Sequence, residues 1–319
     1  MVDRKDLQIL YYLDQDCRQS IARIAKRVHL HRNVVQYRIR KMEQEKVIRG
    51  YYTQINTIAL GYLTFRIFLS ISNATSAQEN SLIEYFKKEL RTIWFFRTQG
   101  TWDFDAILVA RSLVEIEGFL QDFQVKFNSI IEEKNLAIFT QIYDLPKDYL
   151  IEKKRAYGKH VFSTLHPLRA NEHEEVIIRL LGSDARMHII DLAEKASLSV
   201  NTVKSIMRAL MKKGIIVKFR VFIDTAKSGY RYYKIHMNLK QYEAKDLARI
   251  KTWFGTDARV ISINTLINGE DIETELHMRS EQEMNKFMRQ LKEEFGFMIK
   301  KTFIIEFTEE FIYRYLPSE

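Results

Sequence analysis

The chain has 319 residues, 46% of them hydrophobic and 29% charged, a composition typical of a globular protein with room for two or three domains. We find no apolar run of the roughly 18 residues that a membrane-spanning helix needs, and the start of the chain does not resemble a signal peptide. Cys17 is the only cysteine, which excludes an internal disulfide and a multi-cysteine metal site and favours a reducing cytoplasm.

The net charge of +9 is concentrated in short blocks of the chain. Residues 1–60 contain 12 Lys or Arg against 6 Asp or Glu, residues 171–230 contain 10 against 7, and residues 146–170 contain 6 against 2. Segregated positive charge suits a polyanionic partner such as nucleic acid. Charge alone does not separate this interpretation from one of ordinary solvated lysines.

Three short helices are predicted at the start of the chain. Apolar residues at helical spacing predict helices over about 4–13, 21–28 and 31–45, with Ser20 as the N-cap of the second helix. Because only a short turn separates the second helix from the third, the three form a helix-turn-helix. The alternating pattern of 47–56 then predicts a strand that leads out of this domain.

The following region alternates strands with helices in the order β-α-β-β-α-β. The strands are predicted over 63–72, 93–100, 104–111 and 134–145, and the helices over 76–90 and 112–131. This order is that of the ferredoxin-like fold, a four-stranded antiparallel sheet with both helices on one face, so the fold class is α+β. We expect the many aromatic residues of the strands in the core rather than stacked on a cofactor.

The second half of the chain repeats the first half with an offset of 168 residues. Residues 6–62 match residues 174–230 without a gap, and the identical pairs include Ile9/Ile177, Leu13/Leu181, Asn33/Asn201, Arg40/Arg208 and Gly61/Gly229. The second set of strands is predicted near 232–240, 259–267, 271–279 and 299–315, with helices near 243–255 and 280–295. A single register over such a length indicates a tandem duplication.

The duplication divides the chain into five segments. Helix-turn-helix domains are predicted at 1–60 and 171–230, ferredoxin-like domains at 61–145 and 231–319, and a basic linker at 146–170.

The third helix of each helix-turn-helix presents residue types that contact DNA. With Val35, Ile39 and Met42 facing the core, the residues expected to face outward are His31, Arg32, Asn33, Gln36, Tyr37, Arg38, Arg40 and Lys41. Arg, Asn and Gln near the start of such a helix can read base edges, whereas Arg38 and Lys41 are expected at phosphates. The corresponding set in the second repeat is smaller and less basic: Ser199, Asn201, Lys204, Ser205 and Arg208. For any one of these residues, a solvated helix face is the simpler interpretation.

One motif carries a family resemblance. It runs Ile24-Ala-Lys-Arg-Val-His-Leu-His-Arg-Asn-Val-Val-Gln-Tyr-Arg-Ile-Arg-Lys-Met-Glu43, continues at Leu60-Gly-Tyr62, and is repeated as Leu192-Ala-Glu-Lys-Ala-Ser-Leu-Ser-Val-Asn-Thr-Val-Lys204 and Ser228-Gly-Tyr230. The motif and the β-α-β-β-α-β region resemble the Lrp/AsnC family of feast/famine regulators. The resemblance implies transcription regulation, ferredoxin-like domains that sense amino-acid effectors at their interfaces, and homo-oligomers assembled through paired sheets.

The resemblance also implies an effector site at the turn formed by Gly100, Thr101, Trp102 and Asp103, and no cofactor or metal. Trp102 could fill a pocket there rather than line one. The second repeat has Asn268-Gly-Glu-Asp271 at this turn, so an effector pocket is less expected there.

Two other functions stay open at this point. Siroheme decarboxylases resemble fused or paired copies of the same fold, but they need basic and histidine residues around a tetrapyrrole, and the eight histidines of this chain are scattered along the sequence. Alternatively, the second helix-turn-helix serves protein interaction rather than DNA binding. Because the two third helices differ, we also expect the chain to act as a pseudo-dimer on unequal operator half-sites, with the first repeat providing most of the affinity.

Overall fold

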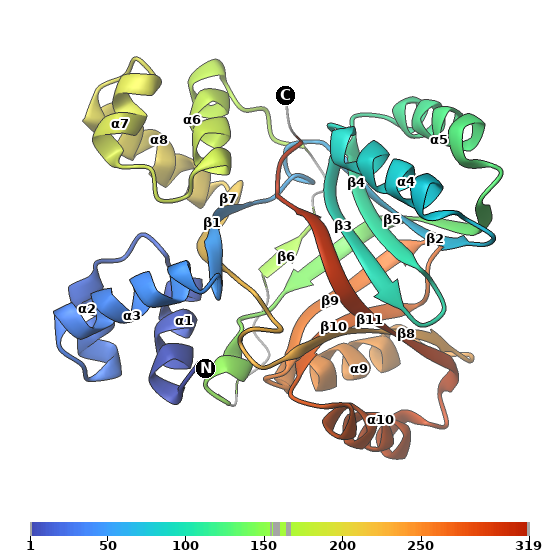
Figure 1. Cartoon of the computed structure of the whole chain (residues 1–319). Helices are drawn as coiled ribbons and strands as arrows, with labels where there is room; N and C mark the ends of the chain where they lie inside the picture. The colour runs from blue at the N-terminus through green and yellow to red at the C-terminus, as the bar shows by residue number, and fades with distance from the viewer. Residues whose placement is uncertain (1, 154, 156–159, 164–166, 318–319) are drawn as a thin grey trace.

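The structure is a computed structural model that describes residues 2–153, 155, 160–163 and 167–317. Figure 1 shows two small helical domains beside one large β-structure that carries further helices on its outer faces. Each helix and strand of residues 4–144 has a counterpart that begins 168 residues later. The tandem duplication is therefore confirmed at the level of individual elements.

The first helical domain is a helix-turn-helix. Its helices are α1 (Arg4–Gln15), α2 (Ile21–Val28) and α3 (Arg32–Gln44). The side chains of Asp3 and Ser20 cap α1 and α2 by accepting hydrogen bonds from backbone N–H groups of the first turn. Val35, Ile39 and Met42 are buried, as their i, i+4, i+7 spacing predicted, and they fix which face of α3 points outward.

The second helical domain repeats this arrangement. Its helices are α6 (Glu172–Ser183), α7 (Ile189–Lys195) and α8 (Val200–Lys212). Asn171 and Ser199 cap α6 and α8 in the same way. Val203 and Leu210 of α8 are buried at positions equivalent to Val35 and Met42 of α3. The two recognition helices are therefore oriented by the same packing.

A two-stranded antiparallel ribbon joins the two helical domains. It pairs β1 (Ile48–Ile55) with β7 (Ile216–Ile223), and its register places Tyr52 opposite Arg220. These two residues are equivalent positions of the two repeats, so a local two-fold axis passes between them. Helix α1 packs on β7 and α6 packs on β1, so each helical domain is held by the strand of the other repeat.

Each repeat contains a ferredoxin-like sheet, as predicted. The elements of the first are β2 (Leu63–Ile71), α4 (Ser76–Lys88), β3 (Thr92–Gln99), β4 (Phe104–Ala110), α5 (Leu113–Phe127) and β5 (Ile131–Asp144). Those of the second are β8 (Arg231–Leu239), α9 (Ala244–Thr256), β9 (Val260–Ile267), β10 (Ile272–Met278), α10 (Glu281–Phe295) and β11 (Ile299–Tyr313). The strand orders, β5-β2-β4-β3 and β11-β8-β10-β9, are equivalent.

The two sheets close into one eight-stranded barrel. Strand β3 pairs with β11 and β5 pairs with β9, so each sheet joins the other at both edges. The short strand β6 (His160–Phe162) adds to β5, and a 3-10 turn (Asp148–Leu150) packs Tyr149 and Leu150 against the core of the first helical domain. The sheet pairing that the resemblance assigned to a homo-oligomer thus occurs within a single chain.

Candidate DNA-binding surface and barrel interior

The outward face of α3 is formed by polar side chains near its N-terminus. His31 caps the helix by accepting from the backbone N–H of Asn33 (Nδ1–N 3.3 Å), and both residues are exposed. Arg32 and Arg40 are also exposed, and Tyr37 is 66% exposed. Exposed polar groups at the N-terminal end of a recognition helix are free to enter a major groove.

The remaining predicted residues of α3 have different surroundings. Gln36 is partly buried. Lys41 is exposed, and its Nζ lies 3.8 Å from Oε1 of Glu45. Arg38 is paired within the domain, because its Nη1 donates to Asp3, the N-cap of α1 (2.7 Å), and to Asp6 of α1 (2.8 Å). Its position therefore differs from the one expected for a phosphate contact: its charge ties α3 to the start of α1.

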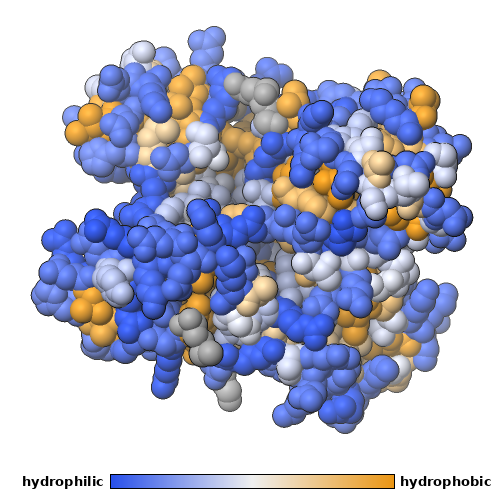
Figure 2. All heavy atoms as spheres, in the orientation of Figure 1, coloured by the Kyte–Doolittle hydropathy of each residue, from blue (hydrophilic) through white to orange (hydrophobic). Residues whose placement is uncertain are grey.

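The equivalent face of α8 carries different side chains. Its exposed side chains include Ser199, Asn201, Lys204, Ser205 and Arg208. Ile190 of α7 is 57% exposed and Met211 of α8 is 48% exposed. In Figure 2 the visible face of the first helical domain is mostly hydrophilic, and both helical domains show some hydrophobic residues at their outer edges. The two helical domains thus present unequal surfaces.

The turn predicted to bind an effector is packed against its own sheet. Trp102 is 7% exposed and stacks on Phe68, with ring centroids 5.4 Å apart. Asp103 accepts a hydrogen bond from the backbone N–H of Ile71 (2.8 Å), and Thr101 is exposed. Trp102 and Asp103 therefore hold the turn in place, so Trp102 fills the space beneath it.

The same turn contacts the other repeat. Gly100 has φ +135°, and a Cβ atom there would lie 2.7 Å from the backbone oxygen of Ile304 in β11. At the equivalent turn, Asn268 donates from Nδ2 to the backbone oxygen of Leu136 in β5 (2.6 Å). Both turns therefore lie at an interface between the two sensor domains, which is where the resemblance implies effector binding; binding itself stays a prediction.

Two fully buried ion pairs cross the barrel from one repeat to the other. Arg66 of β2 donates to Glu273 of β10, and Lys234 of β8 donates to Asp105 of β4 (Nζ–Oδ2 2.8 Å); all four side chains have zero exposure. Arg66 is equivalent to Lys234 and Asp105 to Glu273, so the local two-fold axis relates the pairs. Because an unpaired buried charge is strongly destabilising, each sheet needs the other.

A third group extends this charged interior. His236 Nδ1 lies 3.0 Å from Glu270 and 3.6 Å from Glu273, a spacing that a metal ion could use. Arg66, however, donates to Glu273 and lies 3.8 Å from Glu270. Burial alone would raise the pKa of Glu273, but Arg66 and His236 outweigh it and hold that pKa well below its usual value. We therefore assign these residues to an ion-pair cluster rather than to a metal site.

A charged cluster also lies beneath the ribbon. Arg220 of β7 donates to Asp14 of α1 (Nη2–Oδ2 2.6 Å) and to Asp144 at the end of β5 (Nη1–Oδ1 2.8 Å), and Lys147 lies 3.3 Å from Asp14. Burial would raise the pKa of Asp14, but Arg220 and Lys147 overcome this effect and lower it to about 2. Arg220 thereby connects the first helical domain, the ribbon and the barrel.

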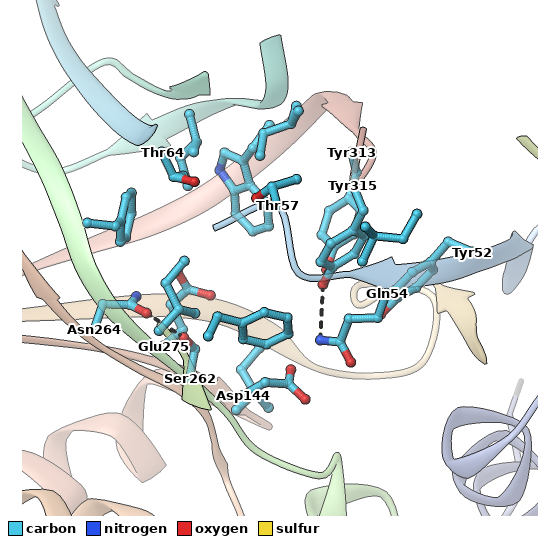
Figure 3. Close-up of a pocket in the computed structure, with 18 of the residues that line it drawn as sticks. Tyr52, Gln54, Thr57, Thr64, Asp144, Ser262, Asn264, Glu275, Tyr313 and Tyr315 are labelled. Atoms are coloured by element: carbon cyan, nitrogen blue, oxygen red, sulfur yellow. Dashed lines mark hydrogen bonds between the residues drawn. The ribbon is translucent and has the colours of Figure 1, made fainter. Parts of the chain in front are cut away.

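Next to this cluster is a cavity of about 140 Å³ between the ribbon and the barrel. Figure 3 shows side chains from both repeats pointing into it, including Gln54 of β1, Thr64 of β2 and Asn264 of β9. The four residues of the predicted effector turn do not contribute to its lining.

Sequence reasoning missed these buried polar groups. For a charged residue within an apolar strand, such as Arg66 between Phe65 and Ile67, the alternation of the strand predicts a side chain that faces solvent. The usable signal was the duplication, because Lys234 repeats the positive charge at the equivalent position and Glu273 repeats the acid of Asp105. A charge kept at the same strand position in both copies indicates a role on the local two-fold axis.

Comparison with known proteins supports the helix-turn-helix assignment. Residues 2–43 match the AsnC-type helix-turn-helix domain, and residues 171–217 match a winged helix-turn-helix DNA-binding domain. An uncharacterized HTH-type transcriptional regulator of Pyrococcus furiosus is 29% identical over 145 residues, which cover 44% of this chain and 94% of that protein. The HTH-type transcriptional regulator Ptr1 of Methanocaldococcus jannaschii is 27% identical over 123 residues, which cover 38% of this chain and 81% of that protein. The resemblance to Lrp/AsnC regulators is confirmed.

Two solved structures of one protein match the chain over nearly its whole length. The siroheme decarboxylase NirDL superposes with a TM-score of 0.63 at 12% identity, covering 99% of this chain and 94% of that one. This match shows that the tandem fold occurs elsewhere. At such low identity it concerns the fold alone.

Within the described ranges, none of the helices combines the length and the apolar character that crossing a membrane requires.

Proposed function

We propose that this chain, with its AsnC-type helix-turn-helix domain, is a sequence-specific transcription regulator that binds double-stranded DNA as its own pseudo-dimer. The observation that carries the proposal is the exposed outward face of α3, where Arg32, Asn33 and Arg40 face solvent on a helix whose opposite side is fixed in the core. The ribbon relates the two helical domains by the local two-fold axis, so we expect α3 and α8 to bind neighbouring parts of one duplex.

The two half-sites of the operator are unequal in this proposal. A symmetric dimer presents two identical helices, whereas here α3 carries Arg32 and Gln36 at positions where α8 carries Val200 and Lys204. The first helical domain supplies most of the base reading, and the second contributes weaker contacts through Lys204 and Arg208. If the second domain contributes no DNA contacts at all, it serves protein interaction only.

Regulation by a small effector completes the proposal. An amino acid or another small molecule bound between the sensor domains changes the relation between barrel and ribbon, and therefore the spacing of α3 and α8. The turn 100–103 is a candidate effector site because it lies at that interface. The protein acts in the cytoplasm, where its DNA is, and further association into homo-oligomers uses surfaces outside the closed barrel.

The test is duplex binding by the full chain after selection from random sequences, repeated over a salt series. We expect an asymmetric site of two dissimilar halves, and a loss of affinity of about 10³-fold between 50 and 200 mM salt if about six phosphates are contacted. Perfect palindromes bound by one chain would contradict the unequal half-sites. Absence of duplex affinity at low salt would refute DNA binding.

The fold shared with NirDL motivates one alternative, a siroheme decarboxylase. The barrel does contain His236 and Arg66, but each is paired with a carboxylate, which speaks against their binding a tetrapyrrole. Titration of the chain with siroheme, followed by absorbance and by analysis of released carboxyl groups, separates the two functions. Stoichiometric binding with loss of carboxyl groups would favour the enzyme.

A further inference from the structure

The cavity between ribbon and barrel is lined by residues of both. Tyr52 and Gln54 belong to β1 of the ribbon, whereas Thr64 of β2, Trp94 of β3 and Asn264 of β9 belong to the barrel. A molecule bound here would touch the strand that carries the helical domains and the sheets that support it (Figure 3).

Four buried polar atoms of residues that line this cavity have no hydrogen-bond partner among the residues that the structure describes. They are the hydroxyl oxygens of Tyr52 and Thr64, Oε1 of Gln54 and Nε1 of Trp94. Tyr52, Gln54 and Thr64 are 9%, 1% and 2% exposed. An unpaired buried polar group costs about 1–3 kcal/mol, so their concentration around one cavity indicates a site built to bind a polar molecule.

The charges at the cavity wall are already balanced. Arg220 is paired with Asp144, and Lys147 lies 3.3 Å from Asp14. A charged or zwitterionic ligand would have to compete with these pairs.

The remaining charged residues of the wall are also occupied. Glu275 accepts a hydrogen bond from the hydroxyl of Tyr232 (2.6 Å), and Arg314 donates from Nε to the backbone oxygen of Thr92 (2.7 Å). The free groups are therefore neutral donors and acceptors, set among apolar residues such as Ile93 and Phe139.

The size of the cavity limits the ligand further. A protein cavity of about 150 Å³ accommodates benzene, so about 140 Å³ fits one six-membered ring. From size, neutrality and the four free polar atoms, we infer that the cavity binds a neutral single-ring molecule with hydrogen-bond donors and acceptors on its edge.

The duplication gives an internal comparison for this site. The positions equivalent to Gln54, Thr64 and Asn264 are Phe222, Tyr232 and Phe96, which line a second cavity on the other side of the local two-fold axis. The cavity beside β1 thus has small polar side chains at three positions where the cavity beside β7 has aromatic rings. Because these side chains differ, we expect the ligand site only in the cavity beside β1.

The inference rests on the proposed function for its regulatory role, because the ligand is the effector. It places the effector against β1 instead of at the turn 100–103, and it replaces an amino acid with a neutral ring. Binding strengthens the contact between ribbon and barrel, and so favours one spacing of α3 and α8.

The experiment titrates the full chain with uracil, nicotinamide and phenol, with benzene as an apolar ring and L-methionine and L-leucine as zwitterions. Binding is followed by calorimetry and by the shift in Tm. The variants are Thr64→Val and Trp94→Phe, each of which removes one free polar atom. Thr92→Val is the matched control, because its buried hydroxyl also lacks a partner but does not line the cavity.

We expect saturable binding of at least one of the three polar rings, weakened about tenfold by Thr64→Val and by Trp94→Phe and unchanged by Thr92→Val. The site is overturned if none of these rings binds at millimolar concentration, if benzene binds equally well, or if Thr92→Val weakens binding as much. Binding of an amino acid that depends on Thr64 overturns the neutral class.

Duplex affinity, measured in parallel, keeps this inference separate from the proposed function. Ring binding without any duplex affinity refutes the regulator and leaves the cavity site standing. Duplex affinity without ring binding refutes the site and leaves the regulator standing. If both occur but the ring does not change duplex affinity, the effector role is refuted.

Discussion

The two helix-turn-helix domains have equivalent helices but opposite charge on their second helices. The exposed side chains of α2 include Arg23, Lys26 and Arg27, and the equivalent exposed side chains of α7 are Asp191, Glu194 and Lys195. Both domains have apolar residues at the positions that form the core. The exposed face of the second helix, which would approach a phosphate backbone, is positively charged only in the first domain. The difference shows that the apolar residues that form the domain and the charged residues of its surface are separate sets, which can diverge independently after duplication.

The two domains are also attached differently. Asp14 at the end of α1 is buried and paired with Arg220 of β7, whereas the equivalent residue of α6 is Gly182, where a Cβ atom would lie 2.8 Å from Cδ1 of Leu316. The first domain is therefore held to the ribbon by a charged cluster and the second by close apolar packing. The two helical domains therefore differ both in their surface charge and in their attachment to the ribbon.

The largest effect is expected from breaking the attachment of the first domain. Asp14→Asn leaves the buried Arg220 without its main partner and should lower the free energy of unfolding by about 3–5 kcal/mol, measured by urea denaturation. Asp191→Asn, on the exposed face of α7, is the control and should change it by less than about 0.5 kcal/mol. Equal effects of the two variants would contradict the difference in attachment.

The same residue predicts a pH dependence. The pKa of Asp14 is about 2 in the folded chain against a usual value of 3.8, so its contribution is fully present above about pH 4 and is lost as the pH falls toward 2. The shift corresponds to about 2 kcal/mol. Unfolding followed between pH 5 and 2 should show a steeper loss in the unmodified chain than in Asp14→Asn.

The next largest effect concerns base reading. Gln36→Ala combined with Arg40→Ala should lower affinity for the selected operator about 100-fold, since each base contact contributes about 1–3 kcal/mol. Lys204→Ala combined with Arg208→Ala should lower it less than about tenfold and mainly reduce the salt dependence. Fluorescence anisotropy measures both. A larger loss from the second pair would reverse the assignment of the dominant domain.

A charge exchange tests the comparison more directly. Asp191→Arg combined with Glu194→Lys gives α7 the charges that α2 has at these positions. Affinity at low salt should rise about tenfold, and the slope of log affinity against log salt should steepen by about 1–2. No change in slope would show that α7 does not approach the DNA backbone.

The smallest effect is expected at Arg38. Its pairs with Asp3 and Asp6 are partly exposed, so Arg38→Ala should lower the free energy of unfolding by only about 0.5 kcal/mol. Because the guanidinium is occupied within the domain, duplex affinity should change less than about twofold. A tenfold loss of affinity would restore Arg38 to the phosphate-contacting role expected from the sequence.

The helices and strands of this fold could be predicted from the sequence because each depends on a local pattern of residues. The spacing of Val35, Ile39 and Met42 gave the orientation of α3, and the alternation of strands gave both ferredoxin-like sheets within a few residues at each end. The outward positions of α3 followed from the same periodicity. Arg38 escaped this reasoning, because an outward position does not reveal that Asp3 and Asp6 reach it from another helix.

The sequence by itself determined the helices, the strands and the duplication, since these depend on periodicity and on an offset of 168 residues. Tertiary structure alone decided that the two sheets close on each other, that Arg66 meets Glu273 and Lys234 meets Asp105, and that Tyr52, Gln54 and Thr64 surround one cavity. The physical reason is that strand pairing between the repeats brings together residues at least 118 positions apart (Asp144 and Ser262 are the nearest such pair in sequence). No local pattern encodes which buried charge faces which, or which polar atom lacks a partner.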